Sequence, residues 1–571
     1  MDSINKPDSW EEKAARKREE CANRIPTEWR LSDAFMAKFS TPLAENKNDF
    51  IRNAAIRESG ILTERELRIT EEYTVAELLY ALANSHLTSV EVTLAYCKRA
   101  AVAQQLVSCL TETLFEEAQQ RAQYLDDLRS QGKLAGPLHG LPVSLKDNFH
   151  YKGREATTGM VSFIGGTSTK NTALVDILLR LGAVLYVKTN VPQTMMTSDS
   201  HNNVFGRTLN PWNTRLGPGG SSGGEGALIA LRGSPIGLGT DIAGSIRIPT
   251  HFCGTYGFKP STSRIPNGFM RTCSTPGLKF ILSSTGPLSL DLNGIEIFLK
   301  AIFSIRPALY DSTALDIPWR DVPGKPVLRI GVMQETFLFP LHPPIRRALN
   351  EAVSLLEAQG HEIVHLNEHN FELLEANDIA WNIFNLDQAA RDLIIKSGEP
   401  VVPAIGIIMQ QIEKVKNTFP YFLGQPTDCD RMETLANLNV RREKLRQRYR
   451  NRWLRYELDI CIAPSSQNTA VSHDTSGIAP YATFLNTLDY PACILPFGEV
   501  NELDNEEFKL VNELTDKEYK LQEGQVAVEY DYELLKGTPT SIQCFTMTMQ
   551  DEECLQMAKQ IDECLKGGKK V

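Results

Sequence analysis

Apolar and polar positions along the chain follow two alternating patterns. Short apolar runs bounded by turn residues predict buried strands. These runs lie at residues 141–145, 184–187, 327–332 and 361–366. Between them, apolar residues recur every three or four positions at 171–181 and 343–360, which predicts helices that stop at a glycine. Such alternation predicts an α/β fold, in which helices cover both faces of a sheet and glycine-rich loops lie at its edge.

Two glycine-rich turns between residues 219 and 249 each carry a serine, Ser221 and Ser245, with no histidine between them. Glycine lets backbone N–H groups approach a ligand closely, so a serine in such a turn can meet a carbonyl oxygen together with several donors. Earlier in the chain, the apolar run PVSLKDNF contains Lys146. A lysine at the end of a buried strand is costly unless the site lowers its pKa or pairs it. These three residues are therefore candidates for catalysis.

The region from Leu138 to Pro260 resembles the amidase signature hydrolases throughout, including KTNVPQTM at 188–195 and TDIAGSIRIP at 240–249. The amino-terminal SWEEKAARKREE and the helix expected at 88–106, with a capping box at its start, are similar to the fungal acetamidase-type branch of that family. The resemblance implies the amidase signature fold, an α/β fold with a large central mixed sheet covered by helices on both faces. It also implies that Lys146, Ser221 and Ser245 form the Ser–cisSer–Lys triad of the family.

The domain organisation is predicted from composition and from the same resemblance. Residues 1–60 are expected to form a charged, helical N-terminal extension, and residues 61–571 a single amidase signature domain. Within that domain, residues of about 368–455 are helix-rich and polar. They resemble the variable part of the family, which covers the substrate pocket.

Hydrolysis of an amide near neutral pH requires an activated hydroxyl and donors that hold the developing oxyanion, because an amide carbonyl is a poor electrophile. We expect Ser245 to be the nucleophile and Lys146 to be the base, acting through Ser221. Lysine has an ordinary pKa of about 10.4, so the site has to lower this pKa by roughly 2 to 3 for lysine to act as a base at pH 7. Burial beside two neutral hydroxyls has that effect.

Further site residues are implied by the resemblance. The oxyanion hole and substrate contacts are assigned to Ile242, Ala243, Gly244 and Ser245, together with Ser221 and Met195. Asp241 and Arg247 flank the nucleophile, and we interpret them as a buried ion pair or hydrogen-bonded scaffold that fixes the loop, in preference to direct contact with substrate.

Two segments depart from the family pattern. The family commonly has glycine at the position of Ala243, and alanine resists a positive φ angle that glycine adopts freely. A positive φ there would mean a strained oxyanion hole, and a negative φ a mild change. The segment 537–550 lacks the glycine that usually follows the strand resembling SIQCF. This second departure concerns the pocket wall and leaves the triad unchanged.

Three other motifs suggest different chemistry. Residues 219–223 fit the G-x-S-x-G elbow of α/β-hydrolases, but a turn-rich loop precedes them where an elbow needs a strand. The same loop has Glu225 where a phosphate-binding loop needs lysine. His361, Glu362 and His365 spell the zinc motif H-E-x-x-H, but a strand is expected there, without the helical spacing that brings two histidines together. No metal site is therefore predicted.

Composition and the sequences near the chain ends limit the classes of binding partner that we expect. A net charge of −10 without a basic stripe argues against nucleic-acid binding, and no segment is long and apolar enough for a membrane span or a leader. The 11 cysteines are scattered, which is typical of reduced thiols in a cytosolic protein. We therefore expect a cytoplasmic enzyme without a cofactor, a membrane or a nucleic-acid partner. The sequence is silent on oligomeric state and leaves a homodimer open.

The expected function is hydrolysis of a small-molecule carboxylic amide to the acid and ammonia or an amine through an acyl-enzyme. Two alternatives stay open at this point. The same triad supports esterase or acyl-transfer activity, because other nucleophiles can resolve an acyl-enzyme. The chain could also be an amidotransferase-like subunit that needs a partner.

Overall fold

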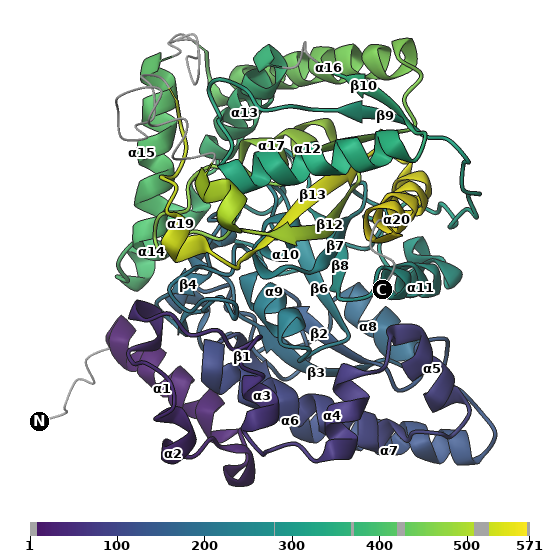
Figure 1. Cartoon of the computed structure of the whole chain (residues 1–571). Helices are drawn as coiled ribbons and strands as arrows, with labels where there is room; N and C mark the ends of the chain where they lie inside the picture. Colours follow the sequence, from purple (N-terminus) through teal and green to yellow (C-terminus); the bar gives the residue numbers. More distant parts are fainter. Residues whose placement is uncertain (1–7, 279, 367–369, 419–428, 507–524, 568–571) are drawn as a thin grey trace, which may run out of the picture.

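The computed structural model describes residues 8–278, 280–366, 370–418, 429–506 and 525–567 (Figure 1). Within these residues the centre is an 11-stranded sheet with the order β1-β3-β2-β6-β8-β7-β12-β13-β11-β9-β10, and β4 and β5 form a separate pair. The strands are β1 (Leu110–Thr113), β2 (Pro142–Lys146), β3 (Val184–Thr189), β4 (His201–Asn202), β5 (Gly206–Arg207), β6 (Ile236–Asp241), β7 (Tyr256–Lys259), β8 (Ser284–Ser289), β9 (Arg329–Val332), β10 (Glu362–His365), β11 (Ile460–Pro464), β12 (Ala492–Glu499) and β13 (Pro539–Phe545).

Helices precede, separate and follow these strands. They are α1 (Trp10–Asn23), α2 (Asp33–Met36), α3 (Ala55–Glu58), α4 (Glu64–Glu71), α5 (Val75–Ala83), α6 (Ser89–Val107), α7 (Phe115–Ser130), α8 (Ala173–Arg180), α9 (Gly223–Ala230), α10 (Arg247–Cys253), α11 (Leu292–Ser304), α12 (Pro343–Ala358), α13 (Asn370–Asn385), α14 (Ala389–Ser397), α15 (Pro403–Thr418), α16 (Arg431–Arg455), α17 (Pro480–Leu488), α19 (Tyr532–Leu535) and α20 (Asp551–Gly567). The helix expected at 88–106 is α6, and Thr88 and Glu91 form a capping box at its N-terminus.

The sheet is mixed. β2 pairs in parallel with β3 and β6, and β9 pairs in parallel with β10 and β11. The other pairs are antiparallel. The strands expected around 141–145, 184–187, 327–332 and 361–366 correspond to β2, β3, β9 and β10. The predicted mixed α/β sheet is therefore confirmed.

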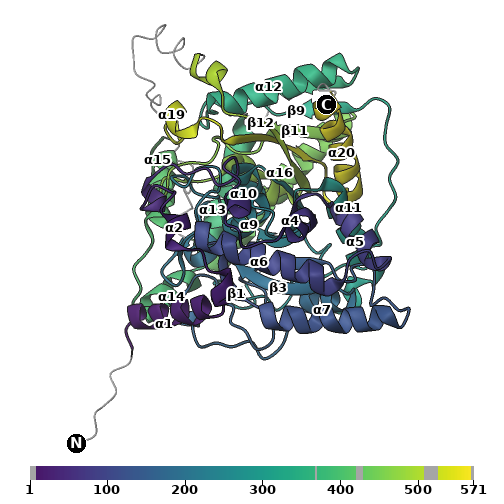
Figure 2. The same ribbon diagram turned by 60° about the horizontal axis from the view of Figure 1, so that its bottom comes forward.

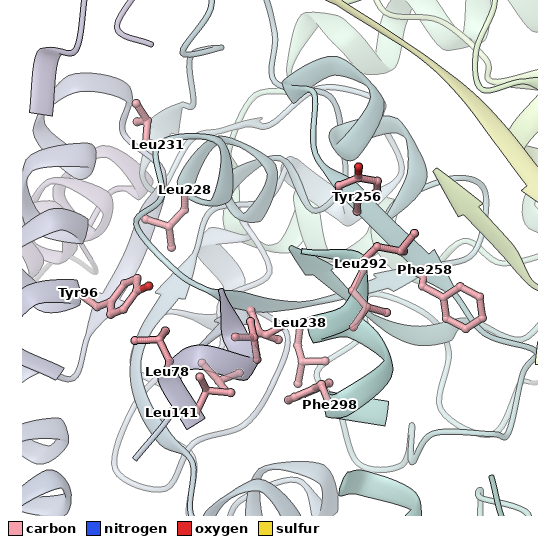
Figure 3. Close-up of a cluster of buried hydrophobic side chains, with 14 of the residues drawn as sticks. Leu78, Tyr96, Leu141, Leu228, Leu231, Leu238, Tyr256, Phe258, Leu292 and Phe298 are labelled. Carbon is pink, nitrogen blue, oxygen red and sulfur yellow. The ribbon is translucent and has the colours of Figure 1, made fainter. Parts of the chain in front are cut away.

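Helices cover both faces of the sheet, as the alternation of side chains along β11 shows. Ile460 and Ile462 pack into the same apolar cluster as α12 and α20, whereas Cys461 and Ala463 pack with α13, α16 and α17. Figure 1 shows α12 in front of β13 and α16 behind this part of the sheet. The first cluster continues into the other half of the molecule, where Leu78 of α5 lies near the β6 and α11 side chains drawn in Figure 3.

The N-terminal residues pack against the rest of the chain. Trp29 and Phe50 belong to the same apolar cluster as β2 and β3. On α1, the buried Lys17 reaches Glu112 on β1 at 2.5 Å and Glu155 at 3.3 Å. Figures 1 and 2 show α1 beside β1, the edge strand of the sheet. The charged pattern of this segment thus includes an ion pair that is removed from solvent.

The functional loops lie at one edge of the sheet because β2 and β6 are parallel neighbours. Lys146 is the last residue of β2, and Asp241 is the last residue of β6. The carboxyl ends of parallel strands meet at the same edge, where ligands bind in open α/β sheets. Helix α9 begins directly after Ser221 and Ser222, and α10 begins directly after the turn that carries Ser245.

Candidate active site

Lys146 is fully buried at the end of β2. Its Nζ lies 2.8 Å from Ser221 Oγ, 3.0 Å from Thr240 Oγ1 and 3.3 Å from the carbonyl oxygen of Thr240. Burial lowers the pKa of Lys146 to about 7, although the carboxylates of Asp241 and Glu225 act in the opposite direction. At neutral pH a large share of this side chain is therefore an uncharged amine that can accept a proton.

A buried carboxyl group lies beside this lysine. Glu225, in the first turn of α9, accepts hydrogen bonds from Ser144 Oγ at 2.6 Å and from Thr189 Oγ1 at 2.9 Å. Ser144 precedes Lys146 by two residues and lies on the same face of β2. Burial raises the pKa of Glu225 to about 8. The site therefore shifts both Lys146 and Glu225 towards their uncharged forms.

The two serine turns meet through the main chain. The Ser222 N–H donates to the carbonyl oxygen of Ser245 at 3.1 Å, and the peptide bond between Gly220 and Ser221 is cis. Gly220 has no room for a side chain, since a Cβ there would lie 2.2 Å from the carbonyl oxygen of Asp199. Within the described residues, no hydrogen bond joins Ser221 Oγ to Ser245 Oγ. The structure thus links Lys146 to Ser221 by a side-chain hydrogen bond, and the two serine turns to each other by the backbone bond from Ser222 to Ser245.

Ala243, at a position where the resembling family commonly has glycine, fits the backbone conformation of the turn before Ser245. The φ angle of Ala243 is not positive, whereas that of Gly244 is +111°. A Cβ on Gly244 would also approach Ala482 Cβ to 2.6 Å. The departure at Ala243 is therefore mild, and the conformation that requires glycine falls on Gly244.

Backbone N–H groups of this turn differ in their availability. Gly244 donates its N–H to Asp241 Oδ1 at 2.9 Å. The N–H groups of Ile242, Ala243 and Ser245 have no acceptor among the residues that the structure describes. Three of the four N–H groups that are expected to form the oxyanion hole thus have no acceptor among the described residues. The fourth, that of Gly244, donates within the turn.

Asp241 and Arg247 form a fully buried ion pair behind the turn. Arg247 donates to Asp241 from Nη2 at 3.0 Å and from Nε at 3.1 Å, and it holds the pKa of Asp241 well below its usual range. Arg247 Nη2 also donates to Asn486 Oδ1 at 2.7 Å and to the Ala482 carbonyl oxygen at 3.0 Å, both on α17. The pair therefore fixes the turn and ties it to α17.

A small cavity of about 20 Å³ opens beside Ser245. Its wall consists of Met195, Met196, Thr197, Ser198, Gly220, Ile242, Ala243, Ser245, Trp381, Ile408, Gly477, Ile478, Ala479 and Thr483. Met195, Ile242, Ala243 and Ser245 thus border one cavity, whereas Ser221 and Lys146 do not belong to its wall.

Sequence reasoning missed three residues of this site. Thr240 contacts Lys146, and its position before Asp241 on the strand next to β2 is a signal that could have identified it. Trp381 and Thr483 line the cavity from α13 and α17. They carry no local signal, because their place in the wall depends on how distant helices pack.

The competing motifs form other structures. His361 and His365 flank and end β10, a strand as the pattern predicts, and His365 Nδ1 lies 3.2 Å from Gln334 Nε2. The residues from 208 to 218 before the G-x-S-x-G match form a loop with isolated bridges and no strand. An α/β-hydrolase elbow is therefore not formed there.

Comparison with known proteins gives concordant results. A protein-family model described as Amidase matches residues 91–555. The chain is 35% identical over 548 residues to an "Amidase" of Gibberella moniliformis, covering 95% of this chain and 97% of the relative. It is 36% identical over 567 residues to an "Acetamidase" of Emericella nidulans, covering 96% of each. Among solved structures, a "Fatty acid amide hydrolase" superposes with a TM-score of 0.82 at 30% identity, covering 97% of this chain and 94% of that one.

Proposed function

The chain belongs to the amidase signature family and is an amide-hydrolysing enzyme, and on that basis we propose that it works through an acyl-enzyme on a triad of Lys146, Ser221 and Ser245. The observation that carries this proposal is the 2.8 Å contact between the buried Lys146 Nζ and Ser221 Oγ. With its pKa lowered to about 7, Lys146 is suited to act as a general base at neutral pH.

In the first half-reaction, Lys146 accepts the proton of Ser221, and Ser221 accepts the proton of Ser245. Ser245 Oγ then forms a bond to the amide carbonyl carbon. The negative charge that develops on the carbonyl oxygen is held by the N–H groups of Ile242, Ala243 and Ser245. The proton passes back through Ser221 to the departing nitrogen as the C–N bond breaks, which leaves an ester on Ser245.

In the second half-reaction, water attacks the ester carbonyl carbon. Its proton travels through Ser221 to Lys146 and then returns to Ser245 Oγ as the acyl–oxygen bond breaks. The products are the carboxylic acid and the free enzyme. The burial of Lys146 supports this route, because it lowers the pKa of the amine to about 7.

The test uses the purified chain alone. We expect ammonia release from a panel of aliphatic and aromatic primary amides, and a fluorophosphonate adduct that mass spectrometry maps to Ser245. The Ser245→Ala variant is the matched control and should carry no adduct. An adduct on Ser221 in the wild-type chain would contradict the assignment of the nucleophile.

The same experiment separates the alternatives. Faster hydrolysis of esters than of every amide tested would favour an esterase that uses the same triad. Ammonia release without a second protein would reject an obligate amidotransferase-like subunit. The relatives named amidase and acetamidase, which align along almost the whole chain, favour the amidase.

Two sequence-based predictions belong to this proposal. All 11 cysteines lie in the described residues and are free thiols, which favours a reducing compartment such as the cytoplasm. None of the described helices combines the length and apolar character needed to span a bilayer. Localisation of a fluorescently tagged chain tests the cytoplasmic prediction, and light scattering of the purified chain tests the homodimer.

A further inference from the structure

Two fully buried polar side-chain atoms in the cavity wall have no hydrogen-bond partner among the described residues. They belong to Trp381, which is 6% exposed, and Thr483, which is 0% exposed. The unpartnered atoms are the indole Nε1, which can only donate, and the hydroxyl Oγ1, which can donate or accept. A buried polar group without a partner destabilises the protein, so a bound group that pairs with these atoms would offset that cost.

These two residues are held rigidly. Helix α13, which carries Trp381, packs on α17, which carries Thr483. Asn377 Nδ2 donates to the Pro480 carbonyl oxygen at 3.2 Å, and Thr487 Oγ1 donates to the Ala376 carbonyl oxygen at 3.1 Å. A rigid pair of helices presents both polar atoms in a fixed arrangement, which favours selective binding.

The rest of the wall limits what can bind. No charged side chain lines the cavity in the part of the chain that the structure describes, and Met195, Ile242, Ile408 and Ile478 supply apolar surface. A charged acyl group would lose its hydration there without a counter-charge. The volume of about 20 Å³ is far below the roughly 300–1,000 Å³ range of pockets for drug-sized ligands. The cavity therefore suits a compact, neutral group.

We propose that Trp381 and Thr483 determine specificity, and that the preferred substrates are primary carboxamides with a compact, neutral acyl group that carries a hydrogen-bond acceptor. This inference rests on the proposed function, because it places the acyl group in the cavity beside Ser245. The Trp381 N–H donates to the acceptor, and the Thr483 hydroxyl supplies the second polar contact. With a primary amide the leaving group is ammonia, so the acyl group is the only bulky part to accommodate.

The test compares benzamide with the three pyridinecarboxamide isomers, which have nearly the same shape and differ by a ring nitrogen. In the wild-type chain, kcat/KM for the best isomer should exceed that for benzamide about tenfold, as expected for one well-placed hydrogen bond. Trp381→Phe keeps an aromatic ring and removes the N–H, and Thr483→Val keeps the shape and removes the hydroxyl. Trp381→Phe should abolish the preference and Thr483→Val should reduce it, because the pyridine amides should lose more activity than benzamide does.

Two control variants guard against a general packing effect. Trp453→Phe removes a buried indole on α16 that does not line the cavity, and it should leave the preference intact. Thr483→Ser should restore most of the preference lost in Thr483→Val. If Trp381→Phe slows benzamide and the pyridine amides equally, or if the wild-type chain shows no preference, the inference is overturned while amidase activity stands. If the folded chain hydrolyses none of a wide amide panel, the proposed function itself fails.

Discussion

The edge of the sheet that carries the proposed triad and the part of the cavity wall that α13 and α17 form differ in how their buried polar groups are paired. At the edge, Lys146, Glu225 and Asp241 are all buried, and the protein itself supplies partners for each of them. In the wall, Trp381 and Thr483 are buried without partners. The ionisable groups of the edge are thus paired within the protein, whereas three N–H groups of the 242–245 turn and the two polar atoms of the wall have no partner among the described residues. On the proposed function, the chemistry should depend on the edge and the selectivity on the wall.

The largest effect should come from removing the nucleophile at the edge. Ser245→Ala leaves no hydroxyl to form an acyl-enzyme, so kcat should fall about 10⁴-fold or more for every amide. Steady-state ammonia release measures the loss. The melting temperature should stay within a few degrees of the wild-type value. Retention of more than about 1% of kcat would remove Ser245 from the proposed role.

Lys146→Ala should have the next largest effect, because it removes the base and leaves the nucleophile in place. We expect a loss of about 10³-fold in kcat/KM at pH 7, within the range usual for general base catalysis. Near-normal rates at this pH would refute the proton relay. Substrates that contact Trp381 and Thr483 well and substrates that do not should lose activity by the same factor, because the proposed base acts on all of them.

The pH profile is the control for Lys146→Ala. Protonated lysine cannot accept a proton, so wild-type kcat/KM should be low in acid, rise as the pH passes about 7 and then level off. In the alanine variant this acid limb should disappear. If wild-type kcat/KM rose near pH 4 and did not change around pH 7, the base would be a carboxylate.

Arg247→Met should remove the hydrogen bonds that connect the edge of the sheet to α17, because Arg247 joins Asp241 to Asn486. Breaking this buried pair leaves the Asp241 charge uncompensated, and the free energy of unfolding should fall by about 3–5 kcal/mol in urea titrations. The control is Arg65→Met, which breaks an exposed pair with Glu91 and should cost less than about 1 kcal/mol. Equal effects of the two variants would deny the structural role of the buried pair.

Ala243→Gly should have the smallest effect. The φ angle of Ala243 is not positive, so glycine relieves no strain and mainly adds freedom to the unfolded chain. We expect a loss of at most about 1 kcal/mol in stability and a change of less than about threefold in kcat/KM. A tenfold gain in kcat/KM would mean that the alanine does restrict the oxyanion hole.

The edge could be predicted from the sequence far better than the wall. Ser221, Ser245 and Lys146 lie in local patterns of glycine, serine and apolar residues, and β2 and β6 carry them to one edge of the sheet. Trp381 and Thr483 look like ordinary helix residues, and only the packing of α13 on α17 brings them to the cavity. Local periodicity shows which face of a helix is apolar, but not which distant element that face meets.

The N-terminal segment shows the same limit for charges. Its alternation of acidic and basic residues predicts a solvated helix, yet the structure buries Lys17 against Glu112. Two oppositely charged residues that are far apart in the sequence give no sign that they will pair. The motif at 240–249 can be identified from adjacent residues, whereas a contact between residues that are far apart in the sequence leaves no such local signal.

The position of α1 has a consequence for the integrity of the whole sheet. β1 is an outermost strand, and exposed outer strands invite pairing with other molecules. Helix α1 shields this strand, and Lys17 neutralises the carboxylate of Glu112 beneath it. A chain that starts after Arg24 should therefore self-associate and precipitate, although every group of the catalytic edge is still present.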